Sequence, residues 1–334
     1  MRIGVDAMGG DFGPAEAVPG AVAACRDFHL AITLFGDRDL LDPQLEQAQA
    51  SGLDIQVVHA PTWVSADEGP VQALKKKPDS SIVCGMQALK DGTVDAFISA
   101  GNTGVLVSGS MLLVGMMPGL RRPGLVALLP TLKRRPLVLV DAGASVDPKP
   151  EQLVDYAVVG SIYAEEILKR TNPTVGLINI GAEPGKGNEL SRQAHQLLQA
   201  APVHFIGNIE AREMLSGDVD VVVADGFVGN VILKLAEGMG MGLFGLMAAE
   251  MRKSTWSRLG GMMLRSRLLG LRAMMDYSEY GGAPLFGPRQ PVIKCHGASH
   301  QDAFKNGARL AAEFVRLDVV GRVQSRLQEV AHGE

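Results

Sequence analysis

Nine short apolar segments recur along this chain of 334 residues, and they constrain its fold more than any other feature. Most are nearly continuous in Val, Ile and Leu, as expected for strands that are covered on both faces. Helix-length segments at 103–115, 150–170, 187–200 and 228–249 lie between them. This alternation predicts an α/β fold with a doubly wound, mostly parallel sheet and helices on both faces, which we expect to form a single domain over residues 1–334. The nine segments are RIGVD, AITLFG, DIQVVH, VDAFIS, PLVLVD, TVGLINI, VHFI, VDVVVA and PVIK.

The ends of six of these segments carry glycine together with Asp or Asn. Ligands of open α/β sheets bind beyond the carboxyl ends of the strands, and turns of this composition direct backbone N–H groups at anions. Several such turns at one edge therefore predict a pocket rich in N–H donors and amides. The turns are DAMGGD (6–11), SAGNTG (99–104), DAGAS (141–145), GAEPGKGNE (181–189), GNIEAR (207–212) and DGFVGN (225–230).

Each of these turns also has a purely structural interpretation, which stays open at this point. Asn102 and Asn230 would equally serve to satisfy the backbone of a turn. Asp6 and Asp225 end strands and would equally cap the helices that follow. Lys186 would then be a solvated loop lysine in a Gly-rich segment.

The common catalytic and nucleotide-binding motifs do not occur in the sequence. The glycines after the first strand lack the GxGxxG spacing, and GAEPGKG (181–187) is one residue shorter than a P-loop. His296 and His300 are four residues apart, but no Glu follows the first His as in HExxH. We therefore expect no metal and no cofactor, but a phosphate-binding type of pocket that contains Lys186.

Composition restricts the setting in which the protein works. Cys25, Cys84 and Cys295 form no CxxC pair and are typical of reduced thiols in a cytoplasmic protein. A net charge of −4 and 5% aromatic residues argue against nucleic acid as a partner. The sequence shows no signal peptide, and we expect no apolar stretch long enough to cross a bilayer.

Ten stretches occur in an order that is specific as a set, although each is weak alone. They are DAMGGD (6–11), KKKPDSS (75–81), SAGNTG (99–104), LRRPG (120–124), DAGASVDPKPE (141–151), LINIGAEPGKGNE (177–189), FIGNIEAR (205–212), DGFVGNVILK (225–234), EYGGAPLFG (279–287) and IKCHGAS (293–299). From the first residues to about residue 310, the chain resembles the bacterial phosphate acyltransferase family, the acyl-ACP:phosphate acyltransferases of phospholipid synthesis.

The resemblance implies a homodimer with a fold similar to isocitrate dehydrogenase and phosphotransacetylase. It implies transfer of a fatty acyl group from acyl carrier protein (ACP) to inorganic phosphate, which gives acyl phosphate for phosphatidic acid synthesis. A membrane glycerol-phosphate acyltransferase would take up that product. The resemblance gives catalytic roles to Lys186 and Asn102. It gives substrate contacts to Asp6, Gly10, Asp11, Ser99, Gly101, Thr103, Gly104, Asn179, Glu183, Asn208, Asp225, Gly226, Asn230 and His296.

The chemistry fits a site without a covalent nucleophile, because phosphate arrives already ionised and needs only cations and N–H dipoles to hold it. The chain departs from the family pattern at Ala66, Ser145, Ala182 and Cys295, where the pattern has Met, Asn, an acidic residue and a small residue such as Ser. The alternative functions are a phosphotransacetylase-type enzyme that uses acyl-CoA, a decarboxylating dehydrogenase of similar fold, and a membrane scaffold without activity.

Residues 250–276 differ from the rest of the chain, with six Lys or Arg residues against two acidic residues. An apolar helical stripe runs from Leu264 to Met275, and Gly260-Gly261 predicts a break into a basic amphipathic hairpin of two short helices. The segment packs on the body or on a partner subunit, lies on the inner face of the membrane, or docks ACP. The candidate contact residues are Arg258, Arg265, Leu268, Leu271 and Arg272.

Overall fold

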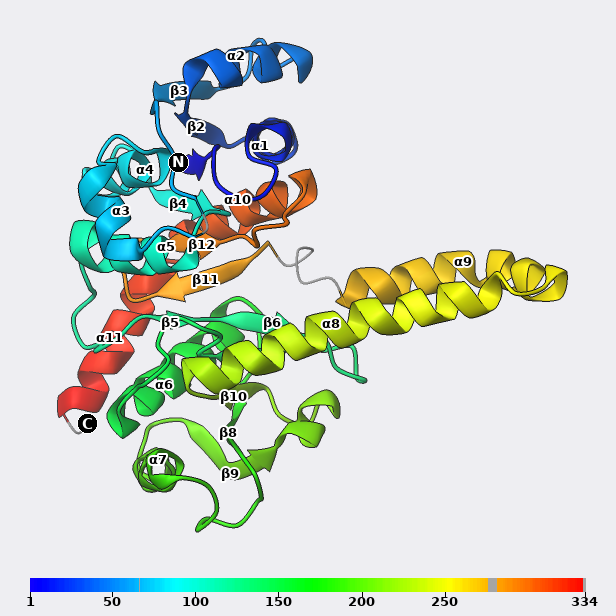
Figure 1. Ribbon diagram of the computed structural model, residues 1–334. Helices are drawn as coiled ribbons and strands as arrows, with labels where there is room; N and C mark the ends of the chain where they lie inside the picture. Colours follow the sequence, from blue (N-terminus) through cyan, green and yellow to red (C-terminus); the bar gives the residue numbers. More distant parts are fainter. Residues whose placement is uncertain (66, 276–280, 333–334) are drawn as a thin grey trace.

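A computed structural model describes residues 1–65, 67–275 and 281–332, and two sheets form its body (Figure 1). The first sheet has seven strands in the order β3-β2-β1-β4-β12-β11-β5, and the second has five in the order β6-β7-β10-β8-β9. The α/β class with a mostly parallel sheet and helices on both faces is confirmed, although the strands are divided between two sheets. The strands are β1 (Arg2–Asp6), β2 (Ala31–Gly36), β3 (Ile55–His59), β4 (Ala96–Ser99), β5 (Gly124–Leu125), β6 (Ala127–Leu129), β7 (Leu137–Val140), β8 (Thr174–Asn179), β9 (His204–Glu210), β10 (Val221–Val223), β11 (Ala283–Phe286) and β12 (Val292–Lys294).

The central strands of the first sheet are buried on both faces, which explains their continuous apolar sequence. In β1, Val5 pairs in parallel with Leu34 of β2 and with Ile98 of β4. Two packed helices, α1 and α10, cover one face, and α4 packs on the other. The helices around this sheet are α1 (Pro14–Phe28), α2 (Arg38–Gln47), α3 (Pro70–Lys76), α4 (Ser81–Lys90), α5 (Thr103–Gly109), which continues as a π-helical turn (Ser110–Val114), and α10 (Gln301–Arg316).

Helix α6 (Pro150–Glu166) is the central helix of the molecule and is buried from Gln152 to Ala164. It packs on β7 and β10 of the second sheet, and also contacts α7 (Glu189–Gln199) and α11 (Val319–His332). Because it is covered nearly all round, its sequence is apolar all round rather than amphipathic.

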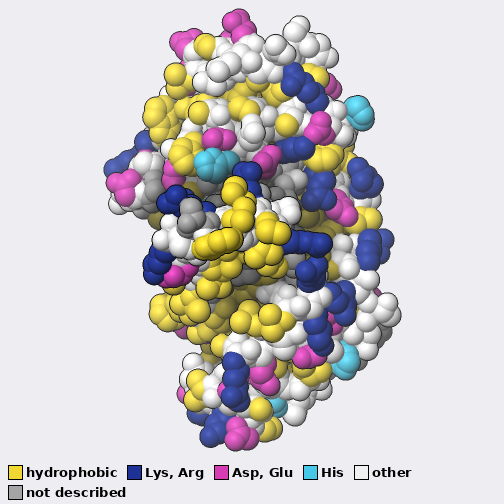
Figure 2. Space-filling view, turned by 90° about the vertical axis from the view of Figure 1, so that its right-hand side faces the viewer, with side chains coloured by type: hydrophobic (Ala, Val, Ile, Leu, Met, Phe, Trp, Pro, Cys, Tyr) yellow, Lys and Arg dark blue, Asp and Glu magenta, His cyan; other side chains and the backbone are white. Residues whose placement is uncertain are grey.

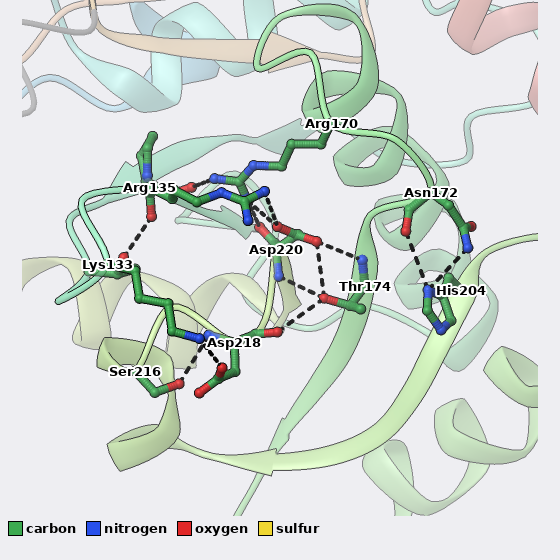
Figure 3. Close-up of polar contacts among 11 residues, drawn as sticks. Lys133, Arg135, Arg170, Asn172, Thr174, His204, Ser216, Asp218 and Asp220 are labelled. Carbon is green, nitrogen blue, oxygen red and sulfur yellow. Dashed lines mark hydrogen bonds and ion pairs between the residues drawn. The ribbon is translucent and has the colours of Figure 1, made fainter.

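A polar network ties together the amino ends of the second sheet's strands (Figure 3). The nearly buried Arg170 donates from Nη1 to Asp220 Oδ1 at 2.6 Å, immediately before β10. The other carboxylate oxygen of Asp220 accepts from the backbone N–H of Thr174, the first residue of β8, at 3.0 Å. Arg170 and Asp220 thus hold the amino ends of β8 and β10 together, whereas ligands of α/β sheets bind at the opposite, carboxyl ends of the strands.

Helices α8 (Gly226–Met251) and α9 (Thr255–Met275) form a long antiparallel hairpin that projects from the body (Figure 1). The predicted break at Gly260-Gly261 is wrong, because α9 runs through both glycines. The hairpin also begins well before residue 250, since α8 supplies its whole first arm. By length and composition alone, α8 is apolar enough to span a membrane, so the expectation that no segment reaches that length is also wrong.

Candidate active site

A cavity of about 680 Å³ lies where the carboxyl ends of the first sheet's central strands face the second sheet and the first turns of α8. Eight of the predicted site residues line it. Three turns of the first sheet, after β1, β4 and β12, supply most of them, and α8 supplies one. They are Gly10, Asp11, Gly101, Asn102, Thr103, Gly104, Asn230 and His296.

Asp6 and Ser99 lie beneath the cavity and hold two of these turns together. Ser99 Oγ donates to Asp6 Oδ2 at 2.6 Å and accepts from Gly101 N at 2.9 Å. Asp6 Oδ1 accepts from the N–H groups of Met8 and Gly9 at 3.2 and 3.1 Å. Burial raises the pKa of Asp6, and the bonds from Ser99 and the backbone oppose that rise. Both side chains thus shape the turns from below rather than lining the cavity.

Asn102 serves the local backbone as well as lining the cavity. Its Oδ1 accepts from Val105 N at 3.1 Å, which caps α5. Its Nδ2 donates to the carbonyl of Glu68 at 3.2 Å, so it also ties down the segment that carries Trp63 and Ser65 at the cavity wall. Asn102 therefore does satisfy the backbone of its turn, as the structural interpretation expects, and it also borders the cavity.

Lys294 is the functional candidate that sequence reasoning missed. It ends β12, lines the cavity and is only 8% exposed. Its Nζ donates to the carbonyls of Ala100, at 3.3 Å, and of Cys295. Burial lowers the pKa of Lys294 to about 8, while the nearby Asp6 and Asp11 oppose that fall. The available signal was a lysine at the end of the apolar run PVIK, where a buried strand leaves no solvent for a charge.

A second cationic element comes from α8. Lys234 Nζ lies 2.9 Å from His296 Nε2 and 3.1 Å from Glu237 Oε2. Ala298 N lies 3.1 Å from His296 Nδ1, so both ring nitrogens have a nitrogen neighbour, and a neutral imidazole accepts from only one of them. Burial, and then the charge of Lys234, lower the pKa of His296. Lys234 and Lys294 therefore give this part of the cavity N–H donors suited to an anion.

The other predicted residues lie outside the cavity wall. Lys186 and Glu183 are exposed in the loop after β8. Asn179 and Asn208 hold that loop, because their Nδ2 atoms donate to the carbonyls of Lys186, at 3.1 Å, and of Glu183, at 2.8 Å. The sequence thus grouped residues from two different sheets into one site, and the structure brings together mainly those of the first sheet.

Asp225 and Gly226 begin α8 and lie beside the turn that follows β7. Asp225 Oδ1 accepts from Val228 N at 2.8 Å and caps the helix. Gly226 N donates to the carbonyl of Ser145 at 2.9 Å, in a contact so close that a Cβ would lie 2.5 Å from that oxygen. These two residues position α8, and through it Asn230 and Lys234, against the cavity.

Asp141, which directly follows β7, is a further residue that the site predictions did not name. Its Oδ1 accepts from the N–H groups of Leu125, Gly143 and Ala144, and its Oδ2 from that of Ser145, at 2.7 to 3.0 Å. One carboxylate thus fixes the turn that contributes Ala142 and Gly143 to the cavity. Burial raises the pKa of Asp141 to about 6.

The arrangement is suited to holding an anion next to an acyl group. Cys295 borders the cavity, but burial raises the pKa of its thiol to about 11, so it remains protonated at neutral pH. Since the thiolate is the nucleophilic form, Cys295 is a poor nucleophile. The cationic groups and the N–H-rich turns are the features of the cavity that are suited to binding an anion.

Comparison with known proteins identifies the family of this chain. The family model described as "Fatty acid synthesis protein" matches residues 1–322. A phosphate acyltransferase of Oceanobacillus iheyensis is 42% identical over 334 residues, covering 100% of this chain and 99% of that protein. A phosphate acyltransferase of Geobacillus thermodenitrificans is 44% identical over 332 residues, covering 99% of this chain and 100% of that protein.

Two solved structures show the same fold at low sequence identity. A phosphotransacetylase from Streptococcus pyogenes gives a TM-score of 0.66 at 17% identity, covering 95% of this chain and 94% of that one. A branched-chain phosphotransacylase from Enterococcus faecalis gives 0.59 at 14% identity, covering 94% of this chain and 99% of that one. With near-complete coverage by relatives more than 40% identical, this chain belongs to the phosphate acyltransferase family of fatty acid synthesis proteins.

Proposed function

We propose that this protein transfers an acyl group from a thioester to inorganic phosphate and releases acyl phosphate and a free thiol. The observation that carries the proposal is the cavity that places Lys294, Lys234 and His296 next to the N–H-rich turns after β1 and β4. The names of the full-length relatives support the same reaction.

In this reaction a phosphate oxygen attacks the carbonyl carbon of the thioester. A C–O bond forms, the C–S bond breaks, and the thiolate leaves with the electron pair and takes a proton from solvent. Lys294 and the turn Gly101–Gly104 would hold the phosphate or the developing oxyanion, where preorganised charge has its largest effect. Holding phosphate and thioester together would contribute several kcal/mol more.

For the acyl donor we propose acyl-ACP, with acyl-CoA as the alternative. The test is phosphate-dependent release of free thiol by the purified protein, with each donor in turn and with phosphate omitted as the control. Release from acyl-ACP at a much higher kcat/KM than from acyl-CoA is the expected result. A preference for acyl-CoA would assign the protein to the phosphotransacetylase type, and release that ignores phosphate would reject the proposed reaction.

Lys186 remains a candidate for contact with the acyl donor, although its side chain is exposed in the loop after β8. An exposed lysine acts mainly by attracting a charged partner. We expect Lys186→Ala to raise the KM for acyl-ACP by about tenfold, roughly 1.4 kcal/mol of binding free energy, with little change in kcat. A large fall in kcat at saturating donor would instead place Lys186 at the reacting atoms.

We further propose that the protein is a cytoplasmic homodimer that associates peripherally with the inner face of the membrane and delivers acyl phosphate to a membrane glycerol-phosphate acyltransferase. The hairpin α8–α9 supports this proposal. Figure 2 views the hairpin end-on from its tip and shows apolar side chains flanked by basic ones. Trp256 is 82% exposed and Met263 78%, and Arg258 and Arg265 are exposed nearby. On α8, Phe227 and Val231 offer an apolar surface for a second subunit.

Of the predicted contact residues, Arg258 and Arg265 are exposed, Leu271 is 44% exposed and Leu268 is half-buried, while the side chain of Arg272 lies outside the described residues. We expect the triple change Arg258→Glu, Arg265→Glu and Arg267→Glu to abolish co-sedimentation with anionic vesicles at low salt. Each cation contributes about 1 kcal/mol near an anionic surface, and reversal makes the contact repulsive.

The matched control for the charge reversal is Trp256→Ser, which removes apolar insertion while keeping every charge. Light scattering should show an unchanged mass for both variants. If the triple variant still binds vesicles but its KM for acyl-ACP rises sharply, the hairpin docks ACP. If its mass falls to that of one chain, the hairpin belongs to the subunit interface.

A further inference from the structure

The cavity contains an apolar section that neither phosphate nor a thioester carbonyl requires. Next to the cationic groups, its wall includes Leu125, Ala127, Ala142, Leu233 and Ala283. One continuous apolar cluster contains four of these residues as buried members, namely Leu125, Ala127, Ala142 and Ala283. Leu233 packs against that cluster. The total volume of about 680 Å³ is that of a site for a drug-sized ligand.

Strand register explains how charge passes directly into apolar surface here. In the antiparallel pair β11–β12, Ala283 lies opposite Lys294, and Leu285 lies opposite Val292. Opposite residues share a face, as do residues two apart along one strand. Leu285 is also paired with Leu125 of β5. On one face of the sheet, the charged pair position of Lys294 and Ala283 is therefore followed, two residues further along each strand, by the apolar pair Leu285 and Val292.

The second sheet and α8 complete the apolar section. Ala127 comes from β6, Ala142 follows β7, and Leu233 lies one turn beyond Asn230 on α8. Ala142 N donates to the carbonyl of Leu125 at 2.8 Å, which joins the two sheets at this point. The apolar section of the cavity is open because the side chains at Ala127, Ala142 and Ala283 are small. Leu125 and Leu233 flank this section.

We propose that this apolar section, lined by Ala127, Ala283, Leu125 and Leu233, binds the first part of the fatty acyl chain and limits its length and bulk. The inference rests on the proposed acyl transfer, because the chain must extend from a carbonyl held near Lys294. An acyl chain is the occupant that fits the continuity between a cationic end and an apolar wall. Burial of each methylene group of that chain would strengthen its binding about fourfold.

The test compares kcat/KM for butanoyl, octanoyl and hexadecanoyl thioesters in two variants of opposite effect. Ala127→Leu fills the section, so we expect kcat/KM for the longer donors to fall by about tenfold or more, while the butanoyl donor changes little. Leu233→Ala enlarges the apolar section. We therefore expect the ratio of hexadecanoyl to butanoyl kcat/KM to rise severalfold above wild type in this variant, whereas it falls in Ala127→Leu. One or two methylene-equivalents of contact are worth a factor of about ten.

The matched control is Leu235→Ala, the same change two residues further along α8 on a side chain that is 60% exposed. It should leave the chain-length profile at wild type. If Ala127→Leu does not fold, Ala283→Val supplies the same narrowing from the other sheet. A wild-type chain-length profile in the folded variants, with phosphate-dependent thiol release intact, overturns the acyl subsite alone. Absence of phosphate-dependent release from every donor in the wild-type protein overturns the proposed function itself.

Discussion

Lys294→Met should lower phosphate-dependent thiol release by at least about a hundredfold, the cost of removing a preorganised charge from a transition state. Methionine is similar in length and apolar, so it fits a position that is only 8% exposed. The change removes the cation that lies between the turn after β4 and the turn after β12. Steady-state rates with acyl-ACP and saturating phosphate measure the effect.

The pH dependence of the same residue gives an independent check. The pKa of Lys294 is lowered to about 8, so the ammonium is present below that pH and lost above it. Wild-type kcat/KM should therefore fall as pH rises through about 8. Lys294→Arg keeps its charge over the whole range, so this fall should disappear in any activity that the arginine variant retains.

Stability should move in the opposite direction to activity. Because the folded pKa lies below the ordinary value of 10.5, the unfolded chain binds more protons between about pH 8 and 10.5. The stability linked to Lys294 is thus present at high pH and is lost as pH falls through about 8. Lys294→Met removes that loss, so its free energy of unfolding at pH 7 should be no lower than that of wild type.

Lys305→Met on α10 is the matched control, since Lys305 forms an ion pair with Asp27 and neither residue lines the cavity. This variant should keep both wild-type turnover and its pH profile. Near wild-type turnover in folded Lys294→Met would remove Lys294 from the mechanism.

The strands that could be predicted from the sequence are those with enough residues to show a pattern. β1, β2 and β8 have five or six residues each, and turn residues follow them. β5 and β6 have two and three residues, too few for any periodicity. They nevertheless separate the two sheets, since β5 pairs with β11 and β6 with β7, both antiparallel. The division into two sheets therefore depends on contacts that the local sequence does not encode.

The site shows the same contrast between local and distant information. Turn composition found Gly101, Asn102 and Asn230, because glycine and asparagine at a strand end are a local signal. Lys294 was missed, because its burial depends on lying opposite Ala283 in one pairing and Ser99 in another. The sequence placed Lys186 in the same predicted site as Gly101, Asn102 and Asn230, because similar turns follow strands of both sheets. The local sequence does not show which sheet a strand joins.

Asp141→Ala should destabilise the protein by about 2 to 4 kcal/mol, because it leaves one buried and three part-buried backbone N–H groups without their acceptor. Each unsatisfied buried donor costs about 1 to 3 kcal/mol. The donors are those of Leu125, Gly143, Ala144 and Ser145. The charge itself is not the source of this stability. Burial raises the folded pKa of Asp141 to about 6 from 3.8, so its titration favours the folded state at low pH and that benefit is lost as pH rises through about 6.

Two further variants separate the hydrogen bonds from the charge. Asp141→Asn keeps one oxygen that can still accept from Leu125, Gly143 and Ala144, so its free energy of unfolding in urea should lie between those of wild type and Asp141→Ala. Asp225→Ala removes a carboxylate that accepts one such bond, from Val228, and should cost only about 1 kcal/mol, as for an ordinary helix cap. If Asp141→Ala loses no more stability than Asp225→Ala, Asp141 does not act as the clamp of the turn after β7. If it loses the expected amount, the wall that carries Ala142 and Gly143 is held in place by one buried carboxylate.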